Sequence, residues 1–307
     1  MDFLLDVFRS KVDVKVWVDK TSLQPGDGLQ VRVELLPKTD FYVRRGKVEL
    51  LCVESYVDKV SGRHGSSYHK RTDTVTVAEE TFMENTDVTP VGDAYGSGAG
   101  YGSQRDYGSE GDYEYGVELC VPQGVLPTMN AAMVKQKKPG IAWKLRVSLD
   151  VPKAVDVRES MPLVVFKPPS LGDLPSSPVV MESKKNHSVL TLSLVGGHAR
   201  FGGILKGSLN VLMLKDVPVY EARVELVKVE RFGDVGHVED MSAVIVEHDV
   251  ELTAGQAQQW DFQLDVPSAG LPSLRTRYSY VKWFVRASLD VRWRFDPVVE
   301  QYITVDF

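Results

Sequence analysis

The sequence repeats one stretch of alternating residues almost unchanged. "IAWKLRVSLDV" at Ile141–Val151 recurs as "VKWFVRASLDV" at Val281–Val291. In both copies apolar residues occupy every second position, with Lys, Arg, Ser and Asp prominent in between. Because side chains alternate between the two faces of a β-strand, this period of two predicts a half-buried strand in each copy. We expect Trp143 and Trp283 to be equivalent residues buried in two cores.

Further matches follow the same order along the chain. "RGKVELLCVES" at Arg45–Ser55 corresponds to "EARVELVKVER" at Glu221–Arg231. "VELCVPQGVLPT" at Val117–Thr128 corresponds to "DFQLDVPSAGLPS" at Asp261–Ser273. The spacing between these matches is longer in the first half of the chain than in the second. The pattern indicates one duplicated domain whose first copy carries a longer middle loop.

Gly and Pro residues separate many of the alternating stretches. Pro25–Gly28 and Gly202–Gly203 are examples, and several strands end at a Val-Pro step, where the missing N–H stops ladder pairing. No segment keeps the 3.6-residue period of a helix for three turns. Short strands with regular breaks are typical of β-sandwiches. The sequence therefore predicts an all-β protein made of two tandem immunoglobulin-like β-sandwiches joined by a Pro-rich linker.

The predicted boundaries follow from two stretches of biased composition. "FKPPSLGDLPSSP" at Phe166–Pro178 favours an extended, stiff connection, so we expect a first sandwich over residues 1–168, a linker over 169–180 and a second sandwich over 181–307. Residues 89–112 are dominated by Gly, Ser, Tyr and Asp. Such a stretch buries too little apolar surface to offset its ordering entropy, which predicts a mobile loop between two strands.

Composition excludes several classes of protein. At 307 residues the chain is long enough for two packed cores, and its formal net charge of −6 disfavours nucleic acid as the main partner. Two cysteines do not make a disulfide framework. No apolar run approaches the ~18 residues of a membrane span, and the first residues lack the pattern of a secretory signal. We expect a soluble protein of the cytoplasm.

Motifs of catalysis and of metal or cofactor binding are weak. "FGGILKGSLNV" at Phe201–Val211 spaces two glycines like a phosphate-binding loop but lacks its lysine and its helix, so a β-turn followed by a strand is predicted. Metal coordination by His64 and His69 with Asp73 is a minor alternative to a solvated hairpin. Neither a nucleophile elbow nor a Cys–His pair is present in the sequence. We expect no catalytic, cofactor-binding or metal-binding residues, and no enzyme.

Three surface features offer candidate contact residues. Arg44, Arg45 and Lys47 lie in "RRGK", which can meet phosphate or anionic lipid, although an ordinary charged turn is the simpler interpretation. Apolar residues near the amino terminus suggest one helical face that packs on the first sandwich or contacts a membrane surface: Phe3, Leu4, Val7 and Phe8. Tyrosines spaced through the glycine-rich stretch are candidate anchors for a partner, with an unconstrained surface loop as the alternative: Tyr95, Tyr101, Tyr107, Tyr113 and Tyr115.

Taken in order along the chain, these segments resemble the arrestin fold, which comprises two consecutive β-sandwiches. The resemblance is carried by "LQPGDGLQVRVEL" at Leu23–Leu35, by the strands "VELLCVES" and "VELVKVER", and by two endings of the form "VP…LP…W…SLD" at 121–150 and 266–290. The family includes arrestins, α-arrestins, the retromer cargo-adaptor subunit and bacterial sporulation-control proteins. It implies a protein that binds cytoplasmic partners rather than one that turns over a substrate.

The sequence thus predicts a non-catalytic scaffold or adaptor that binds protein partners through edge strands, sheet faces and the inter-domain groove. Peripheral association with a membrane fits the same features. One alternative is a carbohydrate- or ligand-binding module, or an enzyme, that uses the Gly/Tyr-rich loop and stacks a ligand on Tyr95, Trp143 or Trp283. Another is a structural protein that assembles through its strand edges.

Overall fold

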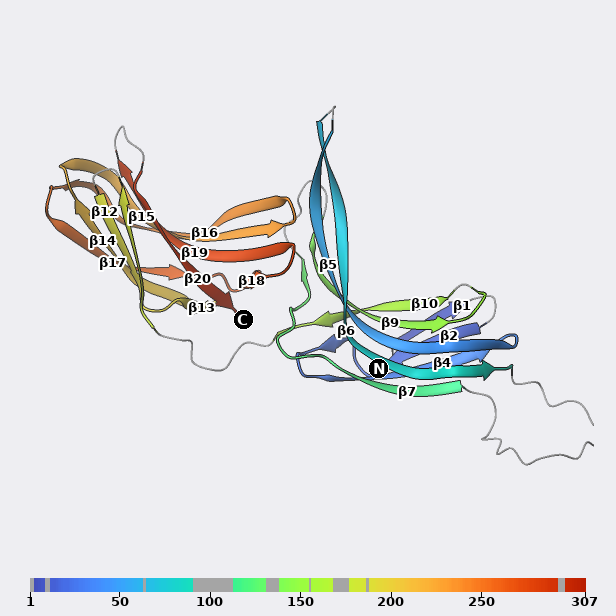
Figure 1. Cartoon of the computed structure of the whole chain (residues 1–307). Coiled ribbons are helices and arrows are strands. Elements are labelled where there is room, and N and C mark those ends of the chain that lie inside the picture. The colour runs from blue at the N-terminus through green and yellow to red at the C-terminus, as the bar shows by residue number, and fades with distance from the viewer. Residues whose placement is uncertain are drawn as a thin grey trace, which may run out of the picture. The chain divides into compact units, whose positions relative to one another are not determined.

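The computed structural model describes residues 3–8, 12–62, 65–90, 113–130, 138–154, 156–167, 177–185, 188–291 and 296–307. The chain forms two compact units (Figure 1). The first comprises Met1–Ser55, Thr72–Met129 and Gly140–Lys167. The second comprises Tyr56–Arg71, Asn130–Pro139 and Pro168–Phe307, so the outer ends of two long strands are grouped with it.

The first sandwich consists of two sheets. One has the strand order β1-β2-β4-β7 and the other β3-β10-β9-β5-β6, with β8 paired to β9. All pairs whose register is described are antiparallel except β3 with β10, which is parallel. The strands are β1 Phe3–Phe8, β2 Val12–Val18, β3 Ser22–Leu23, β4 Gly28–Pro37, β5 Phe41–Gly62, β6 Gly65–Val88, β7 Tyr113–Cys120, β8 Met129–Asn130, β9 Gly140–Asp150 and β10 Val157–Val165.

The second sandwich repeats this topology strand for strand. Its sheets have the orders β11-β12-β14-β17 and β13-β20-β19-β15-β16, with β18 paired to β19 and a parallel pair between β13 and β20. The duplication predicted from the sequence is therefore present in the fold. The strands are β11 Val179–Lys185, β12 Ser188–Leu194, β13 His198–Arg200, β14 Ile204–Met213, β15 Val217–Phe232, β16 Val235–Leu252, β17 Ala257–Asp265, β18 Leu274–Arg275, β19 Ser279–Val291 and β20 Val298–Asp306.

The two tryptophans of the repeated strand are core residues, as predicted. Trp143 on β9 is 1% exposed and Trp283 on β19 is 0% exposed. The indole Nε1 of each donates a hydrogen bond to a backbone carbonyl 3.0 Å away, that of Leu126 in the first sandwich and that of Leu271 in the second. These leucines occupy matching places in the "VP…LP" segments, so the two cores are built alike.

The structure confirms the predicted fold class and contradicts two predictions about local structure. The described residues contain strands and turns but no helix, which confirms the all-β prediction; accordingly, no helix among them could cross a bilayer. The helical face expected at the amino terminus is wrong, because residues 3–8 pair with β2 as strand β1. The turn expected at Arg44–Lys47 is also wrong, because this segment lies inside β5.

The turn expected near Gly202 is confirmed. Gly202 has a φ of 75°, a left-handed conformation that suits glycine, and the N–H of Gly203 donates to the carbonyl of Arg200 at 3.0 Å. Strand β14 begins immediately afterwards at Ile204. Residues 91–112, which make up most of the Gly/Tyr-rich segment, and residues 168–176 of the linker lie outside the described part of the chain.

Candidate functional site

A hollow of about 590 Å³ lies on the outer face of the six-stranded sheet of the first sandwich. It is lined by strands β5, β6, β9 and β10 and by the segment that leads into β10. We call it the charged hollow, because most of its lining side chains are ionised. They are Arg44, Arg45, Lys47, Glu49, Glu84, Asn85, Arg146, Ser148, Leu149, Asp150, Asp156 and Arg158.

The alternation of β5 explains why these side chains gather outside the core. Val48 and Leu50 are fully buried in the sandwich, so Lys47 and Glu49 project from the opposite face of the strand. The register of β5 with β9 places Glu49 directly across from Arg146. Opposite charges on facing residues of neighbouring strands attract each other, and this pair forms the centre of the cluster.

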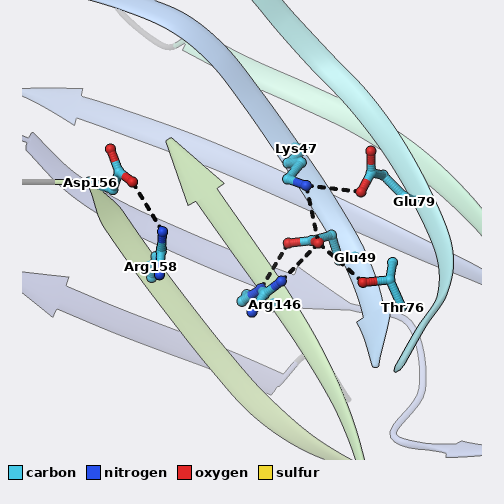
Figure 2. A network of polar contacts seen from close by, with 7 residues as sticks. All are labelled: Lys47, Glu49, Thr76, Glu79, Arg146, Asp156 and Arg158. Atoms are coloured by element: carbon cyan, nitrogen blue, oxygen red, sulfur yellow. Dashed lines mark hydrogen bonds and ion pairs between the residues drawn. The ribbon is translucent and has the colours of Figure 1, made fainter. Parts of the chain in front are cut away.

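Glu49 is the most buried charged residue of the charged hollow, with 2% of its surface exposed. Arg146 holds it with two hydrogen bonds, from Nε to Oε2 and from Nη2 to Oε1, each 2.8 Å long. Lys47 Nζ lies 3.1 Å from Glu49 Oε1 and 2.9 Å from Glu79 Oε2, and Thr76 Oγ1 donates to Glu49 Oε1 at 3.5 Å. Figure 2 shows the Glu49 carboxylate enclosed by these groups.

The surroundings of Glu49 keep it ionised. Burial by itself raises the pKa of Glu49, but the hydrogen bonds and charges of Arg146 and Lys47 outweigh it and hold the pKa below its usual value. The same hydrogen bond raises the pKa of Arg146. A fully ionised, bidentate pair of this kind fixes the facing strands in one register.

The rim of the charged hollow consists of arginines that each meet a carboxylate. Arg44 donates to both oxygens of Asp150, at 2.6 and 2.8 Å, and this contact raises the pKa of Arg44 and lowers that of Asp150. Arg45 lies 3.5 Å from Glu84. At the far side Arg158 lies 3.1 Å from Asp156, as Figure 2 shows. The hollow is therefore nearly balanced in charge.

The sequence singled out some of these residues and missed others. The structure brings Arg44, Arg45 and Lys47 together in the charged hollow. Tyr95, Tyr101, Tyr107 and His64 lie outside the described residues. The burial of Glu49 was not predicted. The repeat gives no signal for it: the charged triad Lys47, Glu49 and Arg146 matches Arg223, Glu225 and Arg286 in type and order, but Glu225 is only half-buried.

The second sandwich lacks this arrangement. There Arg286 donates to Glu300 at 2.9 Å, and Arg223 contacts Glu221 and Glu225. Glu225 lies directly opposite Arg286 in the ladder, but Arg286 donates its hydrogen bond to Glu300 and not to Glu225. The positions that match the three rim arginines hold Tyr220, Glu221 and Val298. The charged hollow is thus a feature of the first copy.

Edge strands form the second candidate feature. Strand β7 is the last strand of its sheet and pairs with β4 from Tyr113 to Cys120; among the described residues its other edge has no partner strand. Strand β17 ends the matching sheet of the second sandwich. An unpaired edge presents backbone N–H and C=O groups that can pair with an added strand.

The structure bears on two alternatives considered from the sequence, a sugar-binding site and a metal site. Stacking of a sugar on Trp143 or Trp283 is wrong, because both indoles are buried in the cores. Within the described ranges no group of three or more His, Cys, Asp and Glu side chains is arranged to hold a metal ion.

The chain matches the model of a known protein family. The family model described as arrestin (or S-antigen), C-terminal domain, matches residues 9–170. The match covers strands β2–β10 of the first sandwich and more than half of the chain. No curated protein matches the sequence.

Proposed function

Since the chain belongs to the arrestin C-terminal domain family, we propose that it is a non-catalytic adaptor that binds protein partners by strand addition at its sheet edges. The observation that carries the proposal is the open edge of β7. This strand holds eight residues in register with β4 and leaves its opposite backbone groups without a partner strand in the described part of the chain. Eight residues are enough to pair with an extended peptide segment.

The alternation of β7 supports the same function. Val117 and Leu119 are buried in the core, so β7 is anchored to the first sandwich by its side chains as well as by its ladder with β4. An anchored edge offers a rigid template, which lowers the entropic cost of binding a flexible segment. Main-chain pairing supplies affinity, and the side chains beside the edge supply selectivity. We place this adaptor in the cytoplasm, on the family resemblance.

The charged hollow supports a structural contribution to this adaptor. Its ion pairs join β5 to β6 and to β9 on the face opposite the core, and they hold these strands of the sheet that neighbours β7 in one register. Arg44, Arg45 and Lys47 remain our candidates for contacts with a partner, because their guanidinium and ammonium groups line an open hollow.

The test is to map where partners bind. The full-length protein is used to capture partners from a lysate of its source organism, and hydrogen–deuterium exchange is measured with and without each captured partner. We expect slower exchange of the β7 amides in the complex, since new ladder bonds protect them. Protection confined to sheet faces would contradict strand addition. Growth of the molecular mass with protein concentration, together with protection of β7 in the absence of any partner, would instead support assembly through the edges.

A further inference from the structure

A groove of about 470 Å³ lies between the edge strands of the two sheets of the first sandwich. Its walls are Glu80–Phe82 of β6 and Glu114–Glu118 of β7. We call it the edge groove. Because β6 and β7 each end a sheet, the edge groove runs along the open backbone edge of β7.

The edge groove has an aromatic floor and an acidic rim. The rings of Phe82 and Tyr115 meet with centroids 5.0 Å apart, and both residues are half-buried. Glu80, Glu114 and Glu118 are exposed around them, and no lysine, arginine or histidine is among the lining residues. One exposed cation, Arg32 on β4, approaches Glu114 at 3.6 Å. The rim therefore keeps a negative potential that favours a cationic ligand.

Gly116 lies in the middle of the exposed face of β7, between Glu114 and Glu118. A Cβ placed on it would meet no atom within 4 Å, so packing within the first sandwich does not require a glycine here. Glycine in a strand weakens it and often marks a place where another backbone comes close. At Gly116 the groove is left open to a ligand strand.

In the second sandwich, side-chain hydrogen bonds join the two matching edge strands, β16 and β17. Trp260, which matches Tyr115, donates from Nε1 to Glu247 of β16 at 3.2 Å. Ser242 of β16 donates from Oγ to the carbonyl of Asp265 at the end of β17, at 2.8 Å. Asp261 stands where the first copy has Gly116. In the first copy the N–H of Thr89, just after β6, donates to the Tyr113 hydroxyl at the start of β7, at 3.1 Å. The first copy differs from the second in the glutamate-lined groove beside the rest of β7.

We propose that the edge groove binds an extended basic segment of a partner protein, which adds to β7 as a further strand. The inference rests on the proposed function and names its partner class. In an added strand, side chains alternate between two faces. Lysine or arginine at every second position then meets Glu114 and Glu118, while the apolar residues between them contact Phe82 and Tyr115. About eight residues span the length of β7, which matches its eight-residue ladder.

The probe is an octapeptide that alternates Lys and Val, compared with one that alternates Glu and Val, titrated against the full chain by isothermal calorimetry. We expect the Lys/Val peptide to bind and its affinity to fall as salt is raised, because exposed charges are screened. The triple variant Glu80→Gln, Glu114→Gln and Glu118→Gln should lower this affinity about tenfold or more. Asp261→Asn, which removes an exposed carboxylate from the matching strand β17, is the control and should leave it unchanged.

Backbone methylation of the peptide tests strand addition. In an added strand only every second N–H points to β7, so N-methylation of one set of alternate residues should abolish binding and methylation of the other set should be tolerated. Equal binding of the basic and acidic peptides, or equal effects of the two methylation sets, would overturn the inference. Unchanged thermal unfolding of the glutamine variant shows that any loss of affinity is local.

The outcomes also separate this inference from the proposed function. If the Lys/Val peptide slows exchange in β17 instead of β7, the edge groove is not its site, but strand addition stands. If captured partners slow hydrogen exchange of the β7 amides while the basic peptide does not bind, the proposed adaptor function is supported. The inference that the partner segment is basic is then wrong. If neither peptides nor partners protect any edge strand, both proposals fail.

Discussion

The indole of Trp143 donates a hydrogen bond to the carbonyl of Leu126, 3.0 Å away, in the first sandwich. The tryptophan comes from β9 and the leucine from the segment between β7 and β8. The bond therefore joins a strand to the connection that crosses the end of the sandwich. Trp283 and Leu271 make the same bond in the second core, at the same length. Duplicated residues thus kept both their burial and their hydrogen-bond partner.

Replacing Trp143 with Phe should destabilise the first sandwich by about 2–4 kcal/mol. The substitution removes part of a fully buried ring and leaves the carbonyl of Leu126 without its donor. Trp283→Phe should have a similar effect on the second sandwich. Urea unfolding followed by circular dichroism measures both. Trp17→Phe is the control, because Trp17 is only half-buried and its change should stay below about 1 kcal/mol. Equal effects at Trp17 and Trp143 would contradict the assignment of Trp143 to the core.

Strands could be predicted from the sequence where apolar and polar residues alternate along the chain. Strands with one buried face, such as β9 and β19, show a period of two and were found. Strands β5 and β6 extend far beyond their alternating segments, because their outer parts are mostly exposed and lack an apolar face. Strand β10 contains Pro162, a residue that sheets accept only where the ladder tolerates a missing N–H, so sequence alone is a weak guide to this strand.

The candidate site was less predictable than the fold. Arg44, Arg45 and Lys47 stood out as a cluster of positive charge, but their carboxylate partners Glu84 and Asp150 are far away in the sequence. The burial of Glu49 depends on Arg146, 97 positions along the chain, and on the register of two strands. A charged residue at an outward position is ordinarily solvated, so only the three-dimensional pairing reveals that this one is enclosed.

Glu49→Gln should lower the stability of the first sandwich by about 2–4 kcal/mol at neutral pH. The substitution leaves Arg146 and Lys47 without their shared carboxylate in a poorly solvated place. Glu225→Gln is the matched control in the second sandwich, where Arg286 bonds to Glu300 instead, and should cost less than about 1 kcal/mol. Comparable losses in the two variants would contradict the special position of Glu49. Chemical unfolding of each variant measures the difference.

Glu49 also predicts a pH dependence. Its pKa in the folded protein lies below the ordinary value of 4.5, so its stabilising contribution is fully present above about pH 4.5. The contribution is lost as the pH falls through the lowered pKa of the folded state, because the carboxylate must then take up a proton. The stability difference between the natural protein and Glu49→Gln should therefore be constant near neutrality and shrink below about pH 4. Unfolding curves recorded between pH 7 and pH 3 test this, and a difference that grows on acidification would contradict it.

Two glycines should differ in how strongly an added methyl group changes the stability of the protein. A Cβ on Gly207 of β14 would lie 2.3 Å from the carbonyl oxygen of Ser193 and 2.7 Å from the ring of Phe262, so Gly207→Ala should destabilise the second sandwich by about 2 kcal/mol or more. Gly116→Ala on β7 meets no atom within 4 Å and should change stability by less than about 0.5 kcal/mol. Thermal unfolding of the two variants measures the contrast. Equal shifts would mean that β7 is more tightly packed than its surroundings indicate.

The two cysteines should differ in reactivity, and one of them reports on the edge of β7. Burial, reinforced by the charge of Glu54, raises the pKa of the Cys52 thiol to about 11, so almost none of it is thiolate at neutral pH. Cys120 is exposed at the end of β7. Brief treatment of the native protein with iodoacetamide at pH 7.5 should therefore label Cys120 and spare Cys52, as read by peptide mass spectrometry. Preferential labelling of Cys52 would contradict its burial. Unfolding in urea is the control and should make both thiols react. A strand added along β7 should slow the labelling of Cys120, whereas a ligand bound in the charged hollow should leave it unchanged.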